Sequence, residues 1–235
     1  MSKIHRFITP FTINEKIVVI DAPDTVKQIV SVLKMKKGEK IILVDTTKFL
    51  DIEVALSELS KKEIKGNILK EHKNKATPKI EVILCAAILK KEHFELLVEK
   101  ASEIGVTQII PLITDRTIKK DIRIDRLEKI AKEATELAGL ARVPEIHEPV
   151  SMKNAFAYTA PHDAVFFCDT EKEGISKPHS YKKAVIFVGP EGGWSEKEME
   201  FATQNKMTFV SLGVTVFRGE TAGIIASYKG VYGLL

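Results

Sequence analysis

The chain has 235 residues, of which 44% are hydrophobic and 29% charged, and its formal net charge is +4. This composition is ordinary for a globular protein, and no apolar stretch approaches the roughly 20 residues that a membrane-spanning helix needs. The first residues, MSKIHR, lack the long apolar segment of a secretion signal, so we expect a cytoplasmic protein with no membrane partner. The charge excess is too small to indicate a nucleic-acid partner by itself.

The cysteines and histidines predict no metal site. Cys85 and Cys168 each lie within an apolar run, which is typical of buried thiols in a reducing compartment. Neither belongs to a Cys-x-x-Cys motif, and the histidines show no His-x-x-x-His spacing. We therefore expect a protein that works without a metal ion.

Short β-type runs near the N-terminus predict a small β-barrel. These runs are residues 16–21, 40–45 and 49–56. Between the first two, residues 24–35 carry apolar side chains at helical spacing, and Asp24 is the expected cap of this helix. Residues 69–80 are polar and rich in lysine and contain Pro78, so we expect them to connect two domains.

The expected domains are residues 1–72 and residues 73–235, and strands and helices alternate in the second. Continuous apolar runs predict strands at residues 81–88, 108–113, 164–168, 184–188 and 208–212. Because these runs have no polar face, we expect them to be buried in a mostly parallel sheet of about five strands.

Helix signals separate most of these strands. A helix over residues 93–105 is expected to end at Gly105. Capping-box spacing predicts that two more helices begin at Asp125 and at Ser195. A last helix is expected over residues 220–235, so the second domain is of the α/β class.

Two loops follow predicted strands at the edge where open α/β sheets bind ligands. The first reads VGPEGGWS at residues 188–195, and the second reads SLGVTVFRGETA at residues 211–222. Neither has the spacing of a Walker loop or of a dinucleotide-binding loop. Glu191 and Glu220 would also repel a phosphate group at the helix starts.

The glycines of these loops allow the main chain to approach a ligand closely. A neutral or cationic ligand suits loops that carry glutamates, and S-adenosylmethionine combines adenine, ribose and a sulfonium cation without any phosphate. An equally open alternative is a tight strand-to-helix turn whose glycines serve backbone geometry alone.

A series of motifs carries a family resemblance along most of the chain. They are HRFI at 5–8, VLKMKKGEKIILVD at 32–45, KASEIGVTQIIPLITDRT at 100–117, RVPEI at 142–146, GPEGG at 189–193 and, in the second loop, Leu212-Gly213, Arg218 and Glu220-Thr221-Ala222. In this order they closely resemble the bacterial ribosomal RNA uridine-N3 methyltransferases, which belong to the SPOUT superfamily and act on small-subunit RNA.

The resemblance implies a fold and partners. The expected fold is a SPOUT-type knotted parallel-sheet methyltransferase domain, preceded by a small PUA-like β-barrel domain that binds RNA. The expected activity is S-adenosylmethionine-dependent methylation of a uridine at N3 in 16S ribosomal RNA. An alternative that keeps the same fold and cofactor is methylation of another RNA position, either a base or a ribose 2′-hydroxyl. A non-catalytic RNA-binding factor is the alternative from another class. A homodimer is also implied. Because a two-domain clamp can read shape as well as a base, we expect the substrate to be the assembled small subunit.

Site residues follow from the matched motifs. For the cofactor we expect main-chain groups at Gly189, Glu191, Gly192, Gly193, Leu212 and Gly213 and a wall around Val216, Phe217 and Ala222. Arg218 is expected to stabilise negative charge that develops on the uracil, or to hold an RNA phosphate. Glu220 is expected to accept a proton or to hold the loop, and stabilisation of the helix dipole is an equal alternative. Trp194 either shields the loop or serves packing.

Basic residues near the ends of predicted elements are candidates for RNA contact. They are Arg6, Lys34, Lys90, Lys91, Arg116 and Arg142. Two positions depart from the family pattern, because Leu137 and Leu140 stand where a glutamine and an arginine are expected. Lys34 also replaces a usual arginine, which keeps the charge but loses the bidentate geometry.

Overall fold

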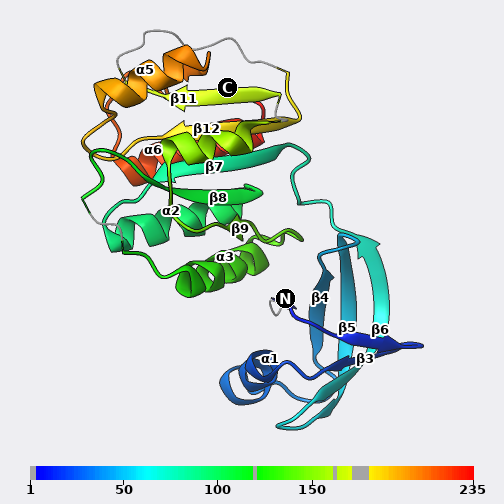
Figure 1. The fold of residues 1–235 in the computed structure, drawn as a ribbon. Coiled ribbons are helices and arrows are strands. Elements are labelled where there is room, and N and C mark those ends of the chain that lie inside the picture. Colours follow the sequence, from blue (N-terminus) through cyan, green and yellow to red (C-terminus); the bar gives the residue numbers. More distant parts are fainter. Residues whose placement is uncertain (1–3, 119–120, 161–162, 171–179) are drawn as a thin grey trace. The chain divides into compact units, whose positions relative to one another are not determined.

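The computed structural model describes residues 4–118, 121–160, 163–170 and 180–235 (Figure 1). The chain divides into two compact units. Unit 1 comprises Met1–Thr77 together with Gly139–Arg142, and unit 2 comprises Pro78–Ala138 together with Val143–Leu235. The expected boundary between residues 72 and 73 is therefore displaced, because it falls within a strand that continues to Lys73.

Unit 1 is built on a six-stranded sheet with the strand order β1-β4-β5-β6-β3-β2. The strands are β1 (His5–Phe7), β2 (Thr12–Asn14), β3 (Ile17–Ile20), β4 (Lys40–Asp45), β5 (Leu50–Leu59) and β6 (Ile64–Lys73). The β1–β4 pair is parallel and the others are antiparallel. No pairing recorded between described strands joins β1 to β2, so closure into a barrel stays a prediction.

One helical segment packs on the core of unit 1. It consists of α1 (Pro23–Lys27) and the wider turn η1 (Gln28–Val32), and it buries Val26 and Ile29 against the sheet. The expected cap at Asp24 is wrong. Ala22 precedes the helix and Pro23 occupies the first turn, because proline has its φ preset for that position and needs no N–H partner there.

Strand β6 was not predicted, because its outer half lacks apolar alternation. Residues 69–73 are all exposed, although they pair with β5 as far as the Leu50–Lys73 register. Main-chain pairing along β5 holds this polar segment in the sheet, whereas its composition alone indicated a linker.

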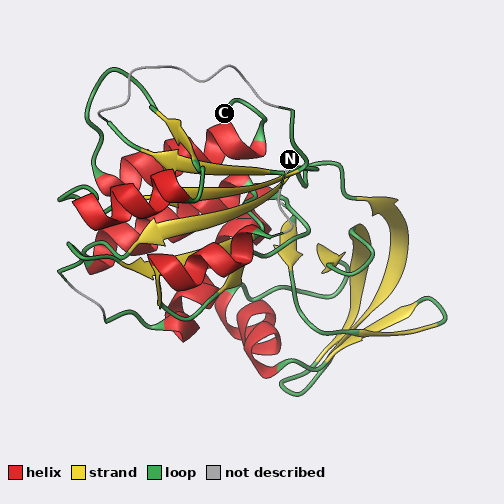
Figure 2. Ribbon diagram, turned by 45° about the horizontal axis from the view of Figure 1, so that its top comes forward, coloured by secondary structure: helices red, strands yellow, loops and turns green. Residues whose placement is uncertain are grey.

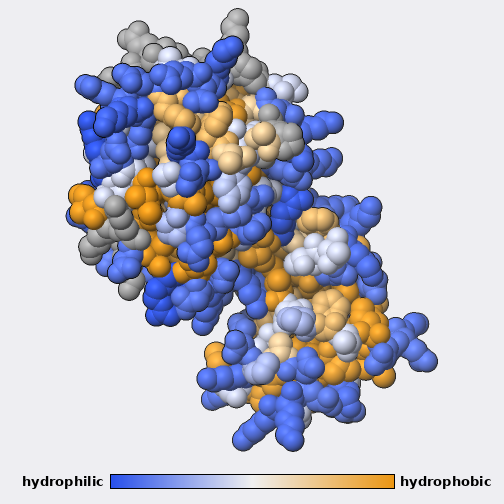
Figure 3. Space-filling model, in the orientation of Figure 1, coloured by the Kyte–Doolittle hydropathy of each residue, from blue (hydrophilic) through white to orange (hydrophobic). Residues whose placement is uncertain are grey.

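Apolar residues also show on the visible face of unit 1, surrounded by hydrophilic ones (Figure 3).

Unit 2 is built on a parallel sheet with the strand order β10-β8-β7-β12-β11-β13, and β9 also pairs with β8. The strands are β7 (Glu81–Ala87), β8 (Gln108–Ile113), β9 (Glu145–Ile146), β10 (Val150–Ser151), β11 (Ala164–Cys168), β12 (Lys183–Val188) and β13 (Thr208–Val210). The five expected strands are confirmed with small shifts at their ends. The two additional strands, β9 and β10, have two residues each and leave no pattern to find.

Helices cover both faces of this sheet (Figure 2). They are α2 (Lys91–Ile104), α3 (Ile124–Ala138), α4 (Met152–Ala155), the 3-10 turn η2 (Phe156–Thr159), α5 (Glu196–Gln204) and α6 (Gly219–Val231). Alternate residues of β7 serve the two faces, since Val82 and Leu84 pack in the core beneath α2, α3 and α6, whereas Ile83 and Cys85 pack beneath α4, η2 and α5.

The helix ends of unit 2 agree with some of the expected caps and contradict one. Gly105 ends α2 with a φ of 100°, as predicted. The capping box of Ser195 and Glu198 at the start of α5 is also confirmed. The box expected at Asp125 is wrong, because α3 begins at Ile124 and the Asp125 carboxylate pairs with Arg123 at 2.6 Å instead.

Candidate functional site

A pocket of about 370 Å³ opens in unit 2 where β11, β12 and β13 end. Its lining includes all nine residues expected to hold a cofactor: Gly189, Glu191, Gly192, Gly193, Leu212, Gly213, Val216, Phe217 and Ala222. The two glycine-containing loops therefore meet at one cavity. It lies at the carboxyl edge of the parallel sheet, where ligands of open α/β folds bind.

The first loop owes its shape to its glycines. Gly193 has a φ of 71°, and its N–H donates to the carbonyl of Pro190 at 2.9 Å, which closes a tight turn. A Cβ atom on Gly189 would lie 2.9 Å from Cε2 of Trp194, so a side chain there would displace the indole. Both positions require glycine, for two different physical reasons.

Trp194 fastens this loop to β11. Its Nε1 donates to the carbonyl of Cys168 at 2.9 Å, and its ring lies 4.5 Å from the ring of Phe167. The indole is buried and forms part of the pocket lining. The tryptophan therefore packs and lines the pocket at the same time.

The turn after β8 braces the start of α5. The Ser195 hydroxyl donates to Oδ2 of Asp115 at 2.6 Å, and the N–H of Asp115 donates to Oε1 of Glu198 at 3.1 Å. Beside them, Nη1 of Arg116 donates to the carbonyl of Gly192 at 2.6 Å. Arg116 is part of the pocket lining, and the RNA contact expected of it stays a prediction.

The second loop joins β13 to α6 and forms the opposite wall. The Ser211 hydroxyl donates to the carbonyl of Gly213 at 2.9 Å, and the Phe217 ring packs over Gly213. Gly219 is buried at the start of α6, where a Cβ would lie 2.6 Å from Cδ2 of Leu89. Small residues thus allow the N-terminus of α6 to approach the end of β7 closely.

The two expected catalytic residues have different environments. Arg218 is exposed and immediately precedes α6, between the lining residues Phe217 and Gly219, but it is not part of the lining itself. Glu220 is only 8% exposed and also lies outside the lining. Its Oε2 lies 3.4 Å from Nδ1 of His93, within ion-pair distance but without the geometry of a hydrogen bond.

The Glu220 environment favours a loop-holding part over proton transfer. The carboxylate lies in the first turn of α6, where the helix dipole stabilises negative charge, and it faces α2 through His93. His93 was missed by sequence reasoning. No spacing rule could have found it, because its partner is more than a hundred residues away on another helix.

Residues at the end of β11 and directly after it were also missed. Cys168, Asp169 and Thr170 line the pocket. They lie at the carboxyl end of a strand, where open α/β sheets bind ligands, as the two predicted loops do. The sequence AVFFCD, an apolar run that ends in an acid, could have indicated them. Burial raises the pKa of the Cys168 thiol to about 12, so this lining sulfur is protonated at neutral pH.

Two of the expected RNA contacts already have partners within unit 1. Nη1 and Nη2 of Arg6 donate to the two carboxylate oxygens of Asp51 at 3.0 and 2.8 Å, and the guanidinium is part-buried. The Arg142 guanidinium lies 5.1 Å from the centre of the Phe49 ring. RNA contact by these side chains stays a prediction, and it would have to compete with these interactions.

The remaining expected contacts are less constrained. Lys34 is exposed and has a φ of 52°, and Lys90 is exposed at the N-cap of α2. Lys91 begins α2, but its side chain lies outside the described part of the structure. Of the two departures from the family pattern, Leu137 is 69% exposed on α3, whereas Leu140 is buried and fills an apolar site.

The described residues contain no group of three or more histidine, cysteine, aspartate or glutamate side chains that could hold a metal ion. Across the same residues, no helix combines the length and the hydropathy needed to cross a membrane.

The described lining of the pocket is slightly acidic. It contains the carboxylates of Asp169 and Glu191 and the guanidinium of Arg116, so the net charge of these side chains is −1.

Comparison with known proteins identifies the family to which the chain is similar. Residues 75–228 match the family of RNA methyltransferase domains. The ribosomal RNA small subunit methyltransferase E of Rickettsia conorii is 33% identical over 67% of this chain and 67% of its own length. The ribosomal RNA small subunit methyltransferase E 2 of Borreliella burgdorferi is 31% identical over 86% of this chain and 87% of its own length.

A solved structure extends the likeness to three dimensions. The ribosomal RNA small subunit methyltransferase E of Neisseria gonorrhoeae, bound to S-adenosyl methionine, superimposes with a TM-score of 0.86 at 26% identity and over 97% of each chain. The parallel-sheet unit thus has the mixed α/β fold of this relative. With matches of this extent in sequence and in structure, the chain belongs to the family of ribosomal RNA small subunit methyltransferases E.

Proposed function

We propose that this protein transfers a methyl group from S-adenosylmethionine to N3 of a uridine in 16S ribosomal RNA. The observation that carries the proposal is the convergence of both predicted loops on one pocket at the carboxyl edge of the sheet. Family membership supports an RNA substrate in the small subunit, and the cofactor bound to the Neisseria gonorrhoeae relative supports S-adenosylmethionine. The choice of uridine N3 rests on the motif resemblance.

The pocket fits this cofactor. Its volume of about 370 Å³ falls in the usual range of roughly 300–1,000 Å³ for sites that hold small molecules. Val188, Leu212 and Phe217 in the lining would supply apolar surface for an adenine ring, and the main chain of the glycine loops would supply N–H and C=O groups for its edge. A single net negative charge on the lining complements the net positive charge of S-adenosylmethionine.

When bound, the cofactor supplies an electrophilic methyl group. The chain supplies alignment, because displacement at a methyl carbon requires donor and acceptor in line. We assign Arg218 to the uracil, where its guanidinium would stabilise the negative charge that appears as the N3 proton passes to solvent water. We assign Glu220, through its contact with His93, to holding the N-terminus of α6 in place.

The target atom is tested by reverse transcription. A methyl group at N3 blocks Watson–Crick pairing, so we expect a stall at one position of 16S ribosomal RNA that is absent from cells lacking this protein. A stall that persists in those cells would show that the target is wrong. Nucleoside mass spectrometry of RNA modified by the purified protein separates N3-methyluridine from a 2′-O-methyl nucleoside or another methylated base.

Cofactor binding is tested separately by calorimetry. We expect heat on titration with S-adenosylmethionine at submillimolar concentration. Its absence, combined with retained RNA binding, would favour a non-catalytic RNA-binding factor.

The quaternary and domain features implied by the resemblance complete the proposal. We propose a homodimer, a threaded chain in the SPOUT unit, a PUA-like RNA-binding role for unit 1, and the assembled small subunit as substrate. Light scattering tests the dimer, for which we expect twice the mass of one chain. Comparing transfer to naked 16S ribosomal RNA with transfer to purified small subunits tests the substrate, and faster transfer to the particle is expected.

A further inference from the structure

Arg116 is held in the pocket wall by a hydrogen-bonded turn. The N–H of Thr114 donates to Oγ1 of Thr117 at 3.0 Å, and the N–H of Thr117 donates back to the carbonyl of Thr114 at 3.1 Å. Between them, Asp115 is bound to Ser195 and Glu198 at the start of α5. The backbone that carries Arg116 is therefore anchored on both sides of the residue.

The arginine side chain lies along the glycine loop. A Cβ on Gly192 would be 3.6 Å from both Cβ and Cδ of Arg116, which is ordinary van der Waals contact. Among the described residues, the guanidinium donates from Nη1 to the carbonyl of Gly192. A guanidinium has five N–H donors in a planar fork, so this one bond leaves donors that can face a ligand in the pocket.

Arg116 is the single cation among the described residues that line the pocket, beside the acids Asp169 and Glu191. If the proposed function holds, the ligand carries three charges: a sulfonium, an ammonium and one carboxylate. The two acids attract the cations of such a ligand, whereas they repel its carboxylate. Among the described lining side chains, Arg116 carries the positive charge that offsets this repulsion, and planar pairing with a carboxylate is the geometry a guanidinium favours.

We infer that Arg116 binds the methionyl carboxylate of the cofactor while it holds the glycine loop through Gly192. This inference rests on the proposed function and adds an orientation to it. The methionyl end of the ligand faces the turn after β8, so the adenine end faces the loop after β13. Arg116 thereby determines specificity for a cofactor that retains its carboxylate.

The test compares two ligands and measures both dissociation constants by calorimetry. S-adenosylmethionine and decarboxylated S-adenosylmethionine share every group except the carboxylate. We expect the wild-type protein to prefer the first by at least tenfold. In Arg116→Met the preference should vanish or reverse, because the lining then carries two negative charges and the decarboxylated ligand carries one more positive charge.

Two further variants separate charge from structure. Arg116→Lys keeps the positive charge without the fork, so it should retain part of the preference. Arg123→Met removes an exposed arginine that is paired with Asp125 outside the pocket, and it should leave both affinities unchanged. Thermal melting of each variant confirms that the fold is retained.

The alternatives give different results. If Arg116→Met weakens both ligands by the same factor, the arginine only braces the loop and the inference is overturned. It is also overturned if that variant binds S-adenosylmethionine normally but loses RNA affinity, since Arg116 would then hold a phosphate. Wild-type protein that binds neither ligand would refute the proposed cofactor itself, a result distinguishable from an unchanged ratio.

Discussion

Arg218 and Glu220 are separated by a single residue, but their surroundings give them different parts. Arg218 is exposed at the pocket rim, whereas Glu220 is buried beside α2. We expect Arg218→Ala to abolish methyl transfer while S-adenosylmethionine affinity stays within about tenfold, or about 1.4 kcal/mol. Calorimetry and a transfer assay with radiolabelled cofactor measure the two effects. A large loss of cofactor affinity would place the guanidinium in the cofactor site instead of at the uracil.

We expect the His93–Glu220 contact to contribute to the stability of the fold. His93→Ala would leave a buried carboxylate without its partner, so we expect a loss of roughly 1–3 kcal/mol in the free energy of unfolding. Glu220→Gln removes the charge that needs a partner, and in that background His93→Ala should cost less. Urea denaturation of the two single variants and the double variant measures the coupling. Additive losses would mean that the 3.4 Å contact contributes nothing.

The buried thiols make a prediction about reactivity. Burial raises the pKa of Cys168 to about 12 and raises that of Cys85 as well. A thiol whose pKa is raised on folding stabilises the fold below its unfolded pKa, and this contribution is lost as pH rises toward the folded value. We expect both thiols to resist iodoacetamide at about pH 8, where an exposed thiol is partly ionised, and to react in urea. Mass spectrometry counts the adducts, and rapid labelling of Cys168 in the native protein would contradict its burial.

At the scale of elements, the start of α5 is the point where the pocket loop is secured. The Ser195 hydroxyl accepts from the N–H of Glu198 at 3.3 Å and donates to Asp115. Ser151 caps α4 through a single bond from the N–H of Asn154, also at 3.3 Å, and therefore serves as a matched control. We expect Ser195→Ala to cost more than the ~1 kcal/mol typical of a lost cap, and Ser151→Ala to cost about that or less.

Chemical denaturation measures both serine variants. Ser195→Ala should also weaken S-adenosylmethionine binding, because it removes the hydrogen bond from Ser195 to Asp115 that connects the glycine loop to the turn after β8. Equal losses of stability in the two variants would show that the bond to Asp115 is not important.

Elements with a strong apolar period could be predicted from the sequence, and those held by pairing could not. The five main strands of unit 2 were found because burial on both faces makes a continuous apolar run, as in residues 81–88. Strand β6 was missed because its exposed residues 69–73 stay in the sheet through main-chain bonds to β5. The capping box at Asp125 failed for a related reason, since Arg123 offered that carboxylate a stronger partner.

The candidate site divides in the same way. Loops such as residues 189–193 could be placed by rule, because parallel strands end at one edge of the sheet. The placements of Arg116 and His93 depend on which distant segment each side chain meets, namely the carbonyl of Gly192 and the carboxylate of Glu220. Such contacts between distant segments cannot be predicted from the local sequence around either residue.

At the scale of the whole molecule, charge is unequally distributed. Lysine and arginine outnumber aspartate and glutamate within residues 1–77, whereas residues 78–235 are close to balance. The overall excess of positive charge therefore comes from unit 1. If unit 1 is the RNA-binding part, its lysines should contribute most of the salt dependence of RNA affinity, because each phosphate contact releases condensed counterions.

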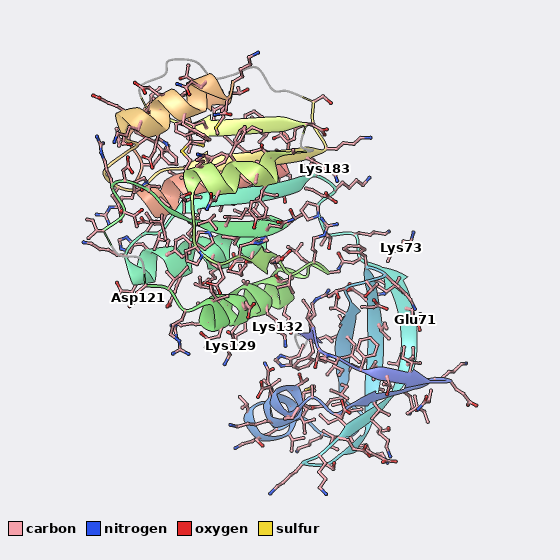
Figure 4. All side chains as sticks on the ribbon, viewed as in Figure 1. Glu71, Lys73, Asp121, Lys129, Lys132 and Lys183 are labelled. Atoms are coloured by element: carbon pink, nitrogen blue, oxygen red, sulfur yellow. The ribbon has the colours of Figure 1, made fainter. Side chains whose placement is uncertain are left out.

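Lys34 gives this idea a sharp test, since it is exposed and was singled out as a backbone contact. We expect Lys34→Gln to weaken binding to 16S ribosomal RNA and to reduce the slope of log affinity against log salt by about 1, with S-adenosylmethionine affinity unchanged. Lys183→Gln is the matched control, because Lys183 pairs with Glu81 at the start of β12, at the edge of the sheet opposite the pocket (Figure 4). Filter binding at several salt concentrations measures both slopes. Equal slopes in the two variants would mean that phosphate contacts are not concentrated in unit 1, because a lysine that meets a phosphate must release ions when it binds.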